Sequence, residues 1–311
     1  MGSIILLSIL LTLPFAAAQE TRDGLLPPAA QDRSAGVAPI REALAARNMA
    51  AAANAAEKLR LREPSNSEAL FWAGYVALAQ GQYYDAIRYL RRAEAFDPNA
   101  FVLKSLAASY YSAHQSRLFL LKMRAAQQKQ PEDFAPYYYL GRYLDSELTD
   151  FSAAADSFKQ ALARQPDHFR SHYYLGQCYE AMGKPEQAEA EYRRALELTE
   201  RQESGAGLPY QGLARLRLAG NRPAEAMAFA KRAVELGPRD ASSHKLLARA
   251  YSDLGQSAEA MVEWEASAEL DPTDAVPPYR LYRGYLSLAE TEKAKSALAQ
   301  YQKVAALYGT N

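Results

Sequence analysis

The sequence predicts an all-α solenoid of about eight helix-turn-helix repeats. Two pairs of prolines, Pro64 with Pro98 and Pro238 with Pro272, are separated by the same interval. An alanine stands twelve residues before each of these prolines: Ala52, Ala86, Ala226 and Ala260. A fixed period of roughly 34 residues is typical of stacked helix pairs, each of which buries its apolar face only against its neighbours.

The chain begins with an apolar run that predicts export. Residues 1–18 (MGSIILLSILLTLPFAAA) contain no charged side chain and end in three alanines. Such a run is too short to cross a bilayer comfortably, and small residues at its end suit signal peptidase. We predict a cleaved signal peptide over residues 1–18; the missing Lys or Arg leaves an uncleaved anchor as the alternative. Residues 19–36 are polar, contain Pro27-Pro28, and predict a flexible leader.

The most complete repeat runs from Phe169 to Glu200. It contains His172, Leu175-Gly176, Tyr179, Gly183, Ala188, Tyr192 and Ala195. This pattern resembles the tetratricopeptide repeat (TPR), whose two helices, here called A and B, carry characteristic residues at fixed positions. Small residues at TPR positions 8 and 20 let the two helices approach closely, and a proline at position 32 ends helix B. The resemblance implies a right-handed superhelix over residues 37–308.

The other repeats follow on the same frame. They begin at about Gly36, Ser67, Phe101, Phe134, Gly207, Asp240-Ala241 and Ala275. Repeat four has Glu147-Leu148-Thr149-Asp150 where the glycine between its helices is expected. Residues 201–206 insert a spacer before repeat six, which is either a surface loop or a hinge between two blocks of repeats.

The balanced charge argues against a nucleic-acid-binding protein, and the lack of catalytic motifs argues against an enzyme. Lys+Arg and Asp+Glu number 36 each, so no overall field favours nucleic acid or an anionic membrane. Cys178 is the only cysteine, which excludes an intramolecular disulfide and predicts a buried thiol. Of the four histidines, His172 and His244 occupy a core position of the repeat. No catalytic or metal-binding motif is present, and we expect no cofactor.

Aromatic side chains form one candidate binding surface. In the TPR family, positions 5, 9 and 12 of helix A line a concave groove, where aromatic side chains commonly hold extended peptides. The resemblance places Phe71, Tyr75, Tyr138, Tyr173 and Tyr279 on that surface. The alternative is that these rings only pack between adjacent A helices.

A row of arginines forms the second candidate. Arg215, Arg249 and Arg283 are each one repeat length apart at position 9, so stacked repeats align them. Arg249 has Asp253 four residues later, whereas Arg215 and Arg283 have no acid at i±3 or i±4. The remaining candidates at positions 5 and 9 are Gln211, Lys245, Arg142 and Gln177. This row predicts either an anion-binding surface or a solvated basic face.

We therefore predict a non-catalytic scaffold that binds an extended protein segment in its groove. An acidic partner segment would suit the arginines. The signal peptide and the alanine-rich repeats suggest a bacterial periplasm or cell envelope. The alternative is an envelope factor that assists polysaccharide export or modification, with glycans in the groove. The sequence leaves the identity of the partner and the oligomeric state open.

Overall fold

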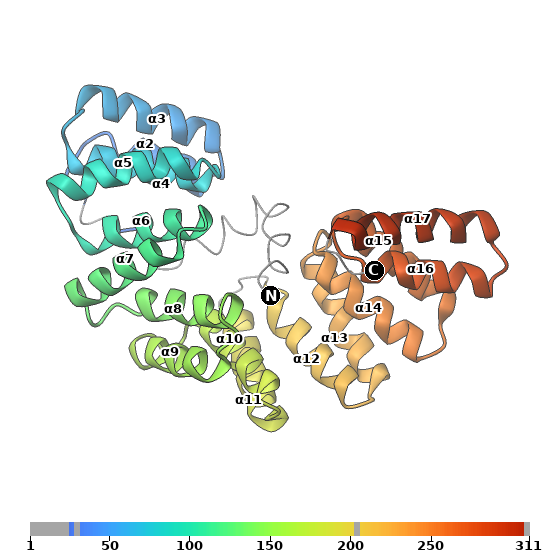
Figure 1. Cartoon of the computed structure of the whole chain (residues 1–311). Coiled ribbons are helices and arrows are strands. Elements are labelled where there is room, and N and C mark those ends of the chain that lie inside the picture. Colours follow the sequence, from blue (N-terminus) through green and yellow to red (C-terminus); the bar gives the residue numbers. More distant parts are fainter. Residues whose placement is uncertain (1–24, 28–31, 202–205, 308–311) are drawn as a thin grey trace. The chain divides into compact units, whose positions relative to one another are not determined.

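The computed structural model describes residues 25–27, 32–201 and 206–307, and its regular structure there is entirely helical (Figure 1). The predicted signal peptide, residues 1–18, lies outside these ranges. The helices are α2 (Ala38–Ala45), α3 (Met49–Arg62), α4 (Ser67–Ala79), α5 (Tyr83–Phe96), α6 (Ala100–Ser112), α7 (Ser116–Lys129), α8 (Ala135–Ser146), α9 (Phe151–Arg164), α10 (Phe169–Ala181), α11 (Pro185–Arg201), α12 (Leu208–Ala219), α13 (Pro223–Leu236), α14 (Ala241–Asp253), α15 (Ser257–Leu270), α16 (Val276–Ser287) and α17 (Thr291–Leu307). None of these described helices is long and apolar enough to span a membrane.

The helices form eight pairs, which confirms the predicted number of repeats. The turn inside each described pair contains one residue with a left-handed backbone, with φ between 50° and 77°. These residues are Arg47, Gly81, His114, Thr149, Gly183, Asn221, Gly255 and Ala289. Glycine adopts this conformation without strain, but only three of the eight turns have it. A search for the glycine alone would therefore have missed five repeats.

Small residues between the paired helices are fully buried, as the TPR pattern predicts. The alanines at position 20, which are Ala52, Ala86, Ala188, Ala226 and Ala260, are at most 3% exposed. At position 8, a Cβ added to Gly176 would lie 2.7 Å from the ring of Tyr192, well inside van der Waals contact. Close approach of the two helices therefore depends on these residues.

Repeat three begins at Ala100, one residue before the predicted Phe101. Helix α6 starts at Ala100, after the N-cap Asn99, whose side chain accepts hydrogen bonds from the Phe101 and Val102 amides. The proline at its end, Pro131, then falls at the ordinary position 32, and Lys104 takes position 5. Repeat four instead has one extra residue in its turn, where Asp150 caps α9 by accepting from the Ala153 amide at 3.0 Å.

The described chain divides into two compact units. The N-terminal unit contains residues 25–27, 32–144 and 160–166, and the C-terminal unit contains residues 145–159, 167–201 and 206–307. Helices A of neighbouring repeats contact each other: α4 with α6 in the first unit, and α10 with α12 and α12 with α14 in the second. Equivalent positions on these helices therefore fall on one face, which we call the A face of each unit.

Two arginines of α12 join repeats five and six, on either side of the predicted spacer. Arg217 is 7% exposed and donates to both carboxylate oxygens of Glu189 on α11, at 2.9 and 2.7 Å. Arg215 bonds to Glu180 on α10 at 2.9 Å. The Tyr210 hydroxyl of α12 also donates to Glu200 of α11 at 2.9 Å. The repeats flanking the spacer are thus bonded to each other directly.

Candidate binding surfaces

Four of the five candidate aromatic residues are buried and are not available to a ligand. Phe71, Tyr75, Tyr138 and Tyr173 are at most 4% exposed, whereas Tyr279 is 38% exposed. The rings fill the space around the closely packed A helices: the Phe71 ring, for example, lies 5.4 Å from that of Trp72 and 6.1 Å from that of Tyr75. For these four residues the structure agrees with the packing alternative.

Arg215 is paired, contrary to the expectation from its own helix. Its Nε donates to the two oxygens of Glu180 at 2.9 and 3.0 Å, and its Nη2 donates to the Tyr192 hydroxyl at 2.7 Å. The Tyr192 hydroxyl in turn donates to Glu180 at 2.7 Å. Glu180 lies 35 residues earlier, on the preceding helix A, where a search at i±4 does not reach. Arg215 is therefore a structural residue between α10 and α12.

Gln177 belongs to the same polar group in the C-terminal unit. Its Nε2 donates to the Tyr173 hydroxyl at 3.1 Å. Burial raises the pKa of Tyr173, so this hydroxyl stays neutral at physiological pH. The side chain at position 9 of repeat five is thus held by an aromatic residue on its own helix.

Polar side chains at position 5 bond to the start of the next repeat. Each one reaches an aspartate 29 residues later: Lys104 to Asp133 at 2.5 Å, Gln211 to Asp240 at 2.8 Å, and Lys245 to Asp274 at 2.6 Å. Each aspartate also accepts a backbone amide of the next helix A, from Ala135, Ser243 and Val276 respectively. These side chains therefore link neighbouring repeats, and Lys104 was missed because of the one-residue shift in repeat three.

Two arginines of the predicted row, both in the C-terminal unit, are exposed and have no close ion-pair partner among the described residues. The Arg249 side chain is 53% exposed, and its Nε lies 3.8 Å from Asp253, the outer limit of an ion pair. Arg283 is exposed and makes no ion pair among the described residues. Nearby on α16, the exposed Tyr279 ring packs 5.3 Å from that of Tyr301. Arg142, in the other unit, is partly buried and its Nη1 donates to the Tyr138 hydroxyl at 3.4 Å.

A further arginine at position 9 was not recognised in the sequence. Arg41 of α2 stands one repeat length before Tyr75, which makes it the equivalent residue of repeat one. Its Nε and Nη2 donate to the two oxygens of Asp32 at 2.6 Å each, and Nη2 also donates to the Pro27 carbonyl at 2.8 Å. Its guanidinium lies 4.8 Å from the centre of the Trp72 ring. Arg41 therefore binds Asp32 and Pro27, which precede its own helix in the chain.

The described residues of the predicted leader, 25–27 and 32–36, pack against the first two repeats. Leu25 is completely buried. The backbone amides of Arg33 and Ser34 donate to the Glu68 carboxylate at 3.0 and 2.7 Å. This part of the leader is thus held through its backbone as well as through Asp32.

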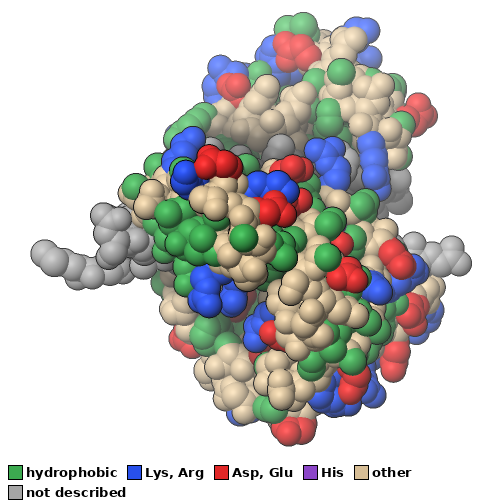
Figure 2. Space-filling model, turned by 90° about the vertical axis from the view of Figure 1, so that its right-hand side faces the viewer, with side chains coloured by type: hydrophobic (Ala, Val, Ile, Leu, Met, Phe, Trp, Pro, Cys, Tyr) green, Lys and Arg blue, Asp and Glu red, His purple; other side chains and the backbone are tan. Residues whose placement is uncertain are grey.

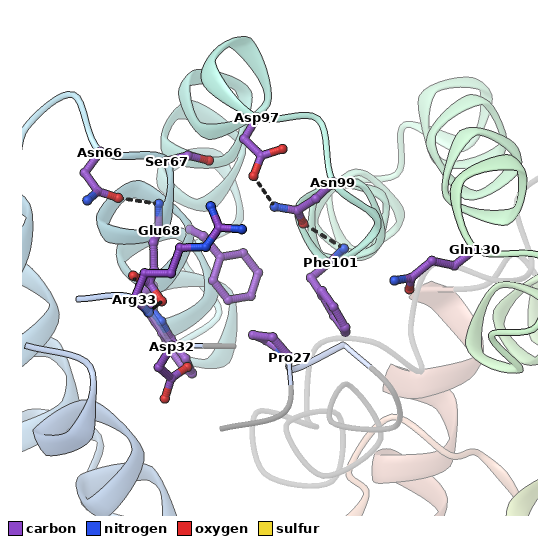
Figure 3. Close-up of a pocket in the computed structure, with 12 residues that line it drawn as sticks. Pro27, Asp32, Arg33, Asn66, Ser67, Glu68, Asp97, Asn99, Phe101 and Gln130 are labelled. Atoms are coloured by element: carbon purple, nitrogen blue, oxygen red, sulfur yellow. Dashed lines mark hydrogen bonds between the residues drawn. The ribbon is translucent and has the colours of Figure 1, made fainter. Parts of the chain in front are cut away.

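A cavity of about 640 Å³ lies beside the leader in the N-terminal unit (Figure 3). Pro27 and Arg33 of the leader line one part of it, and Phe71, Phe101 and Gln130 line another. The helix N-caps Asn66 and Asn99 lie at its edge, where each accepts a backbone amide of the helix that it begins.

The remaining candidates belong to the interior. Cys178 is buried, and burial raises the pKa of its thiol to about 12, which makes it unreactive. His172 and His244 are largely buried and hydrogen-bond through Nδ1 to Glu191 and Glu263 at 2.6 Å each. Within the described residues, no group of three or more His, Cys, Asp or Glu side chains could hold a metal ion.

The charges on the surface are mixed. On the face shown in Figure 2, acidic and basic side chains lie close to one another, without a broad area of one sign. This agrees with the equal numbers of acidic and basic residues in the chain.

Comparison with protein families agrees with this geometry. Residues 40–101, 144–203 and 212–275, together more than half of the chain, match the model of the tetratricopeptide repeat. The chain belongs to the tetratricopeptide repeat family. No curated protein matches the sequence of this TPR protein.

Solved structures show the same fold at low sequence identity. A chain of the Cut9–Hcn1 hetero-tetramer of the APC/C has a TM-score of 0.67 and 16% identity, over 76% of this chain and 48% of that chain. Yeast Tom70 has a TM-score of 0.63 and 15% identity, over 94% and 65%. A tetratricopeptide repeat protein from Parabacteroides merdae has a TM-score of 0.59 and 19% identity, over 76% and 93%. The TPR protein described here thus spans about half of the first of these chains.

Proposed function

We propose that this TPR protein is an exported, non-catalytic scaffold that binds an extended acidic protein segment on the A face of its C-terminal unit. TPR proteins bind peptide or protein partners, and the fold supports this general role. Export to a periplasm or cell envelope rests on the apolar residues 1–18.

The observation that carries the proposal is the state of the position-9 arginines. Arg41 binds the Asp32 carboxylate and the Pro27 carbonyl of its own chain. Arg249 and Arg283 have the same register on their helices but are exposed, and Asp253 engages only the first of them, at 3.8 Å. A foreign segment could therefore make the contacts that Asp32 and Pro27 make with Arg41.

The distance between these arginines determines the spacing of acidic residues expected in the bound segment. The helices that carry them, α14 and α16, both pack against α15. An extended chain advances about 3.3 Å per residue, so acidic residues three positions apart are separated by about 10 Å, and this is the first spacing to test. The exposed ring of Tyr279 adds an apolar contact on the same helix as Arg283.

Paired substitution of the two arginines tests this function. The probe is a fluorescent nonapeptide with two glutamates separated by two residues, and the reference peptide has glutamines in their place. R249Q/R283Q should weaken binding of the glutamate peptide about tenfold or more at low salt. Exposed ion pairs contribute only about 0–1 kcal/mol each, so single variants should show small losses that disappear at high salt.

The matched control removes two arginines from B helices of the same unit. Arg193 on α11 and Arg232 on α13 are exposed and form local ion pairs with Glu189 and Glu235. R193Q/R232Q changes the net charge equally and should bind the peptide as the parent protein does. Equal losses in both double variants would show that only net charge matters, and no loss in either would reject the proposal. The same variants on an array of acidic glycans test the polysaccharide alternative.

A further inference from the structure

The N-terminal unit carries a second surface, separate from the one proposed above, that already holds Pro27 and residues 32–34 of the leader. We propose that the surface around Arg41, Glu68 and Phe101 docks a proline-containing acidic segment of a protein partner, and that the leader of this chain is a built-in competitor for it. The leader shows which chemistry the surface accepts.

Arg41 selects a carboxylate and a carbonyl together. Its guanidinium fork meets both oxygens of Asp32 at 2.6 Å, and Nη2 also reaches the carbonyl of Pro27. This bidentate geometry is specific to a planar carboxylate. The two side chains are 23% and 17% exposed, so water has limited access to the pair. A competing segment needs an acidic residue and an apolar or proline-containing stretch before it.

Glu68 selects free backbone amides. It accepts the successive amides of Arg33 and Ser34, which an extended or turning segment presents and a helix interior does not. The Ser34 hydroxyl adds a bond to Glu63 at 2.9 Å. The two bonds to Glu68 involve only backbone amides and so tolerate different side chains, which allows a foreign segment to replace the leader.

The cavity beside the leader gives such a segment additional room. Figure 3 shows Pro27 and the Phe101 ring lining the same space, with the Gln130 side chain at its far side. Its volume of about 640 Å³ is in the range of ordinary ligand pockets. The exposed Gln130 amide can bond to a peptide backbone, and the partly exposed ring of Phe101 can contact an apolar side chain. A partner that uses this cavity makes contacts that the leader lacks.

The leader competes strongly with a free peptide for this surface because the leader is covalently attached to the protein. A tethered segment acts at an effective concentration on the order of millimolar, so a free peptide of the same sequence cannot displace it at micromolar concentration. Weakening the tethered copy, while the surface itself stays intact, should expose the site to a peptide added in trans.

The experiment uses the full chain and a synthetic peptide with the sequence of residues 25–37, LLPPAAQDRSAGV. D32N in the protein removes the carboxylate of the tethered leader and leaves Arg41 and Glu68 in place. Calorimetric titration should show that the unmodified peptide binds the D32N protein at least tenfold more tightly than the parent protein. A peptide carrying the same Asp-to-Asn change should bind the D32N protein at least tenfold more weakly than the unmodified peptide.

Two further variants locate the site. Adding R41Q to D32N should abolish the gained binding, whereas adding R124Q, which removes an exposed arginine from α7, should preserve it. Equal peptide affinities for the D32N and parent proteins, or no binding to either at millimolar peptide, would overturn the proposal. R249Q/R283Q should leave binding of this peptide unchanged, so the test is independent of the function proposed for the C-terminal unit.

Discussion

At the scale of single residues, one arginine position serves different purposes along the chain. Arg41 binds the leader, Arg215 joins two repeats through Glu180, and Arg283 is open to solvent. All three occupy position 9 of helix A, so their register does not distinguish them. The difference comes from whether another part of the chain supplies a carboxylate. The position of an arginine in the repeat therefore does not show whether its side chain is already paired.

Enlarging the buried alanines should destabilise the fold. Ala188 and Ala260 are at most 3% exposed between paired helices, so A188L and A260L force extra atoms into a filled space. Overpacking of this kind costs about 1–3 kcal/mol, which urea unfolding would detect as a lower midpoint. A299L, at an exposed position of α17, should be nearly neutral. Unchanged midpoints for both buried variants would show that the repeat frame is wrong.

The Glu189–Arg217 pair should make stability depend on acidity. The hydrogen bond from Arg217 holds the pKa of Glu189 below its ordinary value of 4.5. Its contribution is therefore complete above about pH 4.5 and is lost as the pH falls through the lowered pKa. E189Q should cost about 1–2 kcal/mol at pH 7, allowing for partial solvent exposure, and the difference from the parent should shrink toward pH 3. E197Q, at an exposed ion pair, should show little change. A constant difference across this range would contradict the assignment.

At the scale of helices, the aspartates before the A helices act in two directions. Asp240 caps α14 through the Ser243 amide at 2.7 Å and also accepts the Gln211 side chain of α12 at 2.8 Å. The Asp240 carboxylate thus caps α14 and also bonds α14 to α12 of the preceding repeat. These polar bonds link consecutive repeats in addition to their apolar packing.

This double role should make Asp240 more important than an ordinary cap. D240A should cost about 2–3 kcal/mol, because it removes the cap and deprives the buried Gln211 amide of one partner. D150A removes the exposed cap that Asp150 provides to the Ala153 amide of α9 and should cost about 1 kcal/mol. Urea unfolding of the two variants side by side measures the difference. Equal losses would mean that the Gln211 bond adds nothing.

At the scale of the whole molecule, a protein of this kind needs no single central core. Each repeat buries its apolar face against its neighbours, so its stability depends mainly on contacts between adjacent repeats. The two proposed docking surfaces, around Arg41 and around Arg283, belong to different units of one chain. If both proposals hold, the protein binds two segments at once.

Export should be visible at the N-terminus of the native protein. The apolar residues 1–18 and the alanines before Gln19 predict cleavage by signal peptidase. Mass spectrometry of protein from its own host should therefore find a chain that starts at Gln19, open or cyclised. An intact Met1 on protein from the cytoplasm would contradict export, and an intact Met1 in the membrane fraction would indicate the uncleaved anchor.

The sequence by itself determined the helix pairs, their number and the tight alanine contacts inside each pair. These features depend on residues less than one repeat apart, so the regular spacing of the prolines and alanines is enough to predict them. Only the tertiary structure decided which candidate residues are available. Phe71 and Tyr138 pack between closely spaced helices, Arg215 finds Glu180 on the preceding A helix, and Asp32 reaches Arg41 across a turn. A one-residue shift turns a helical side chain by about 100°, which is why Lys104 was missed. The other partners lie on neighbouring helices, and the local sequence pattern does not give the distance or angle between those helices.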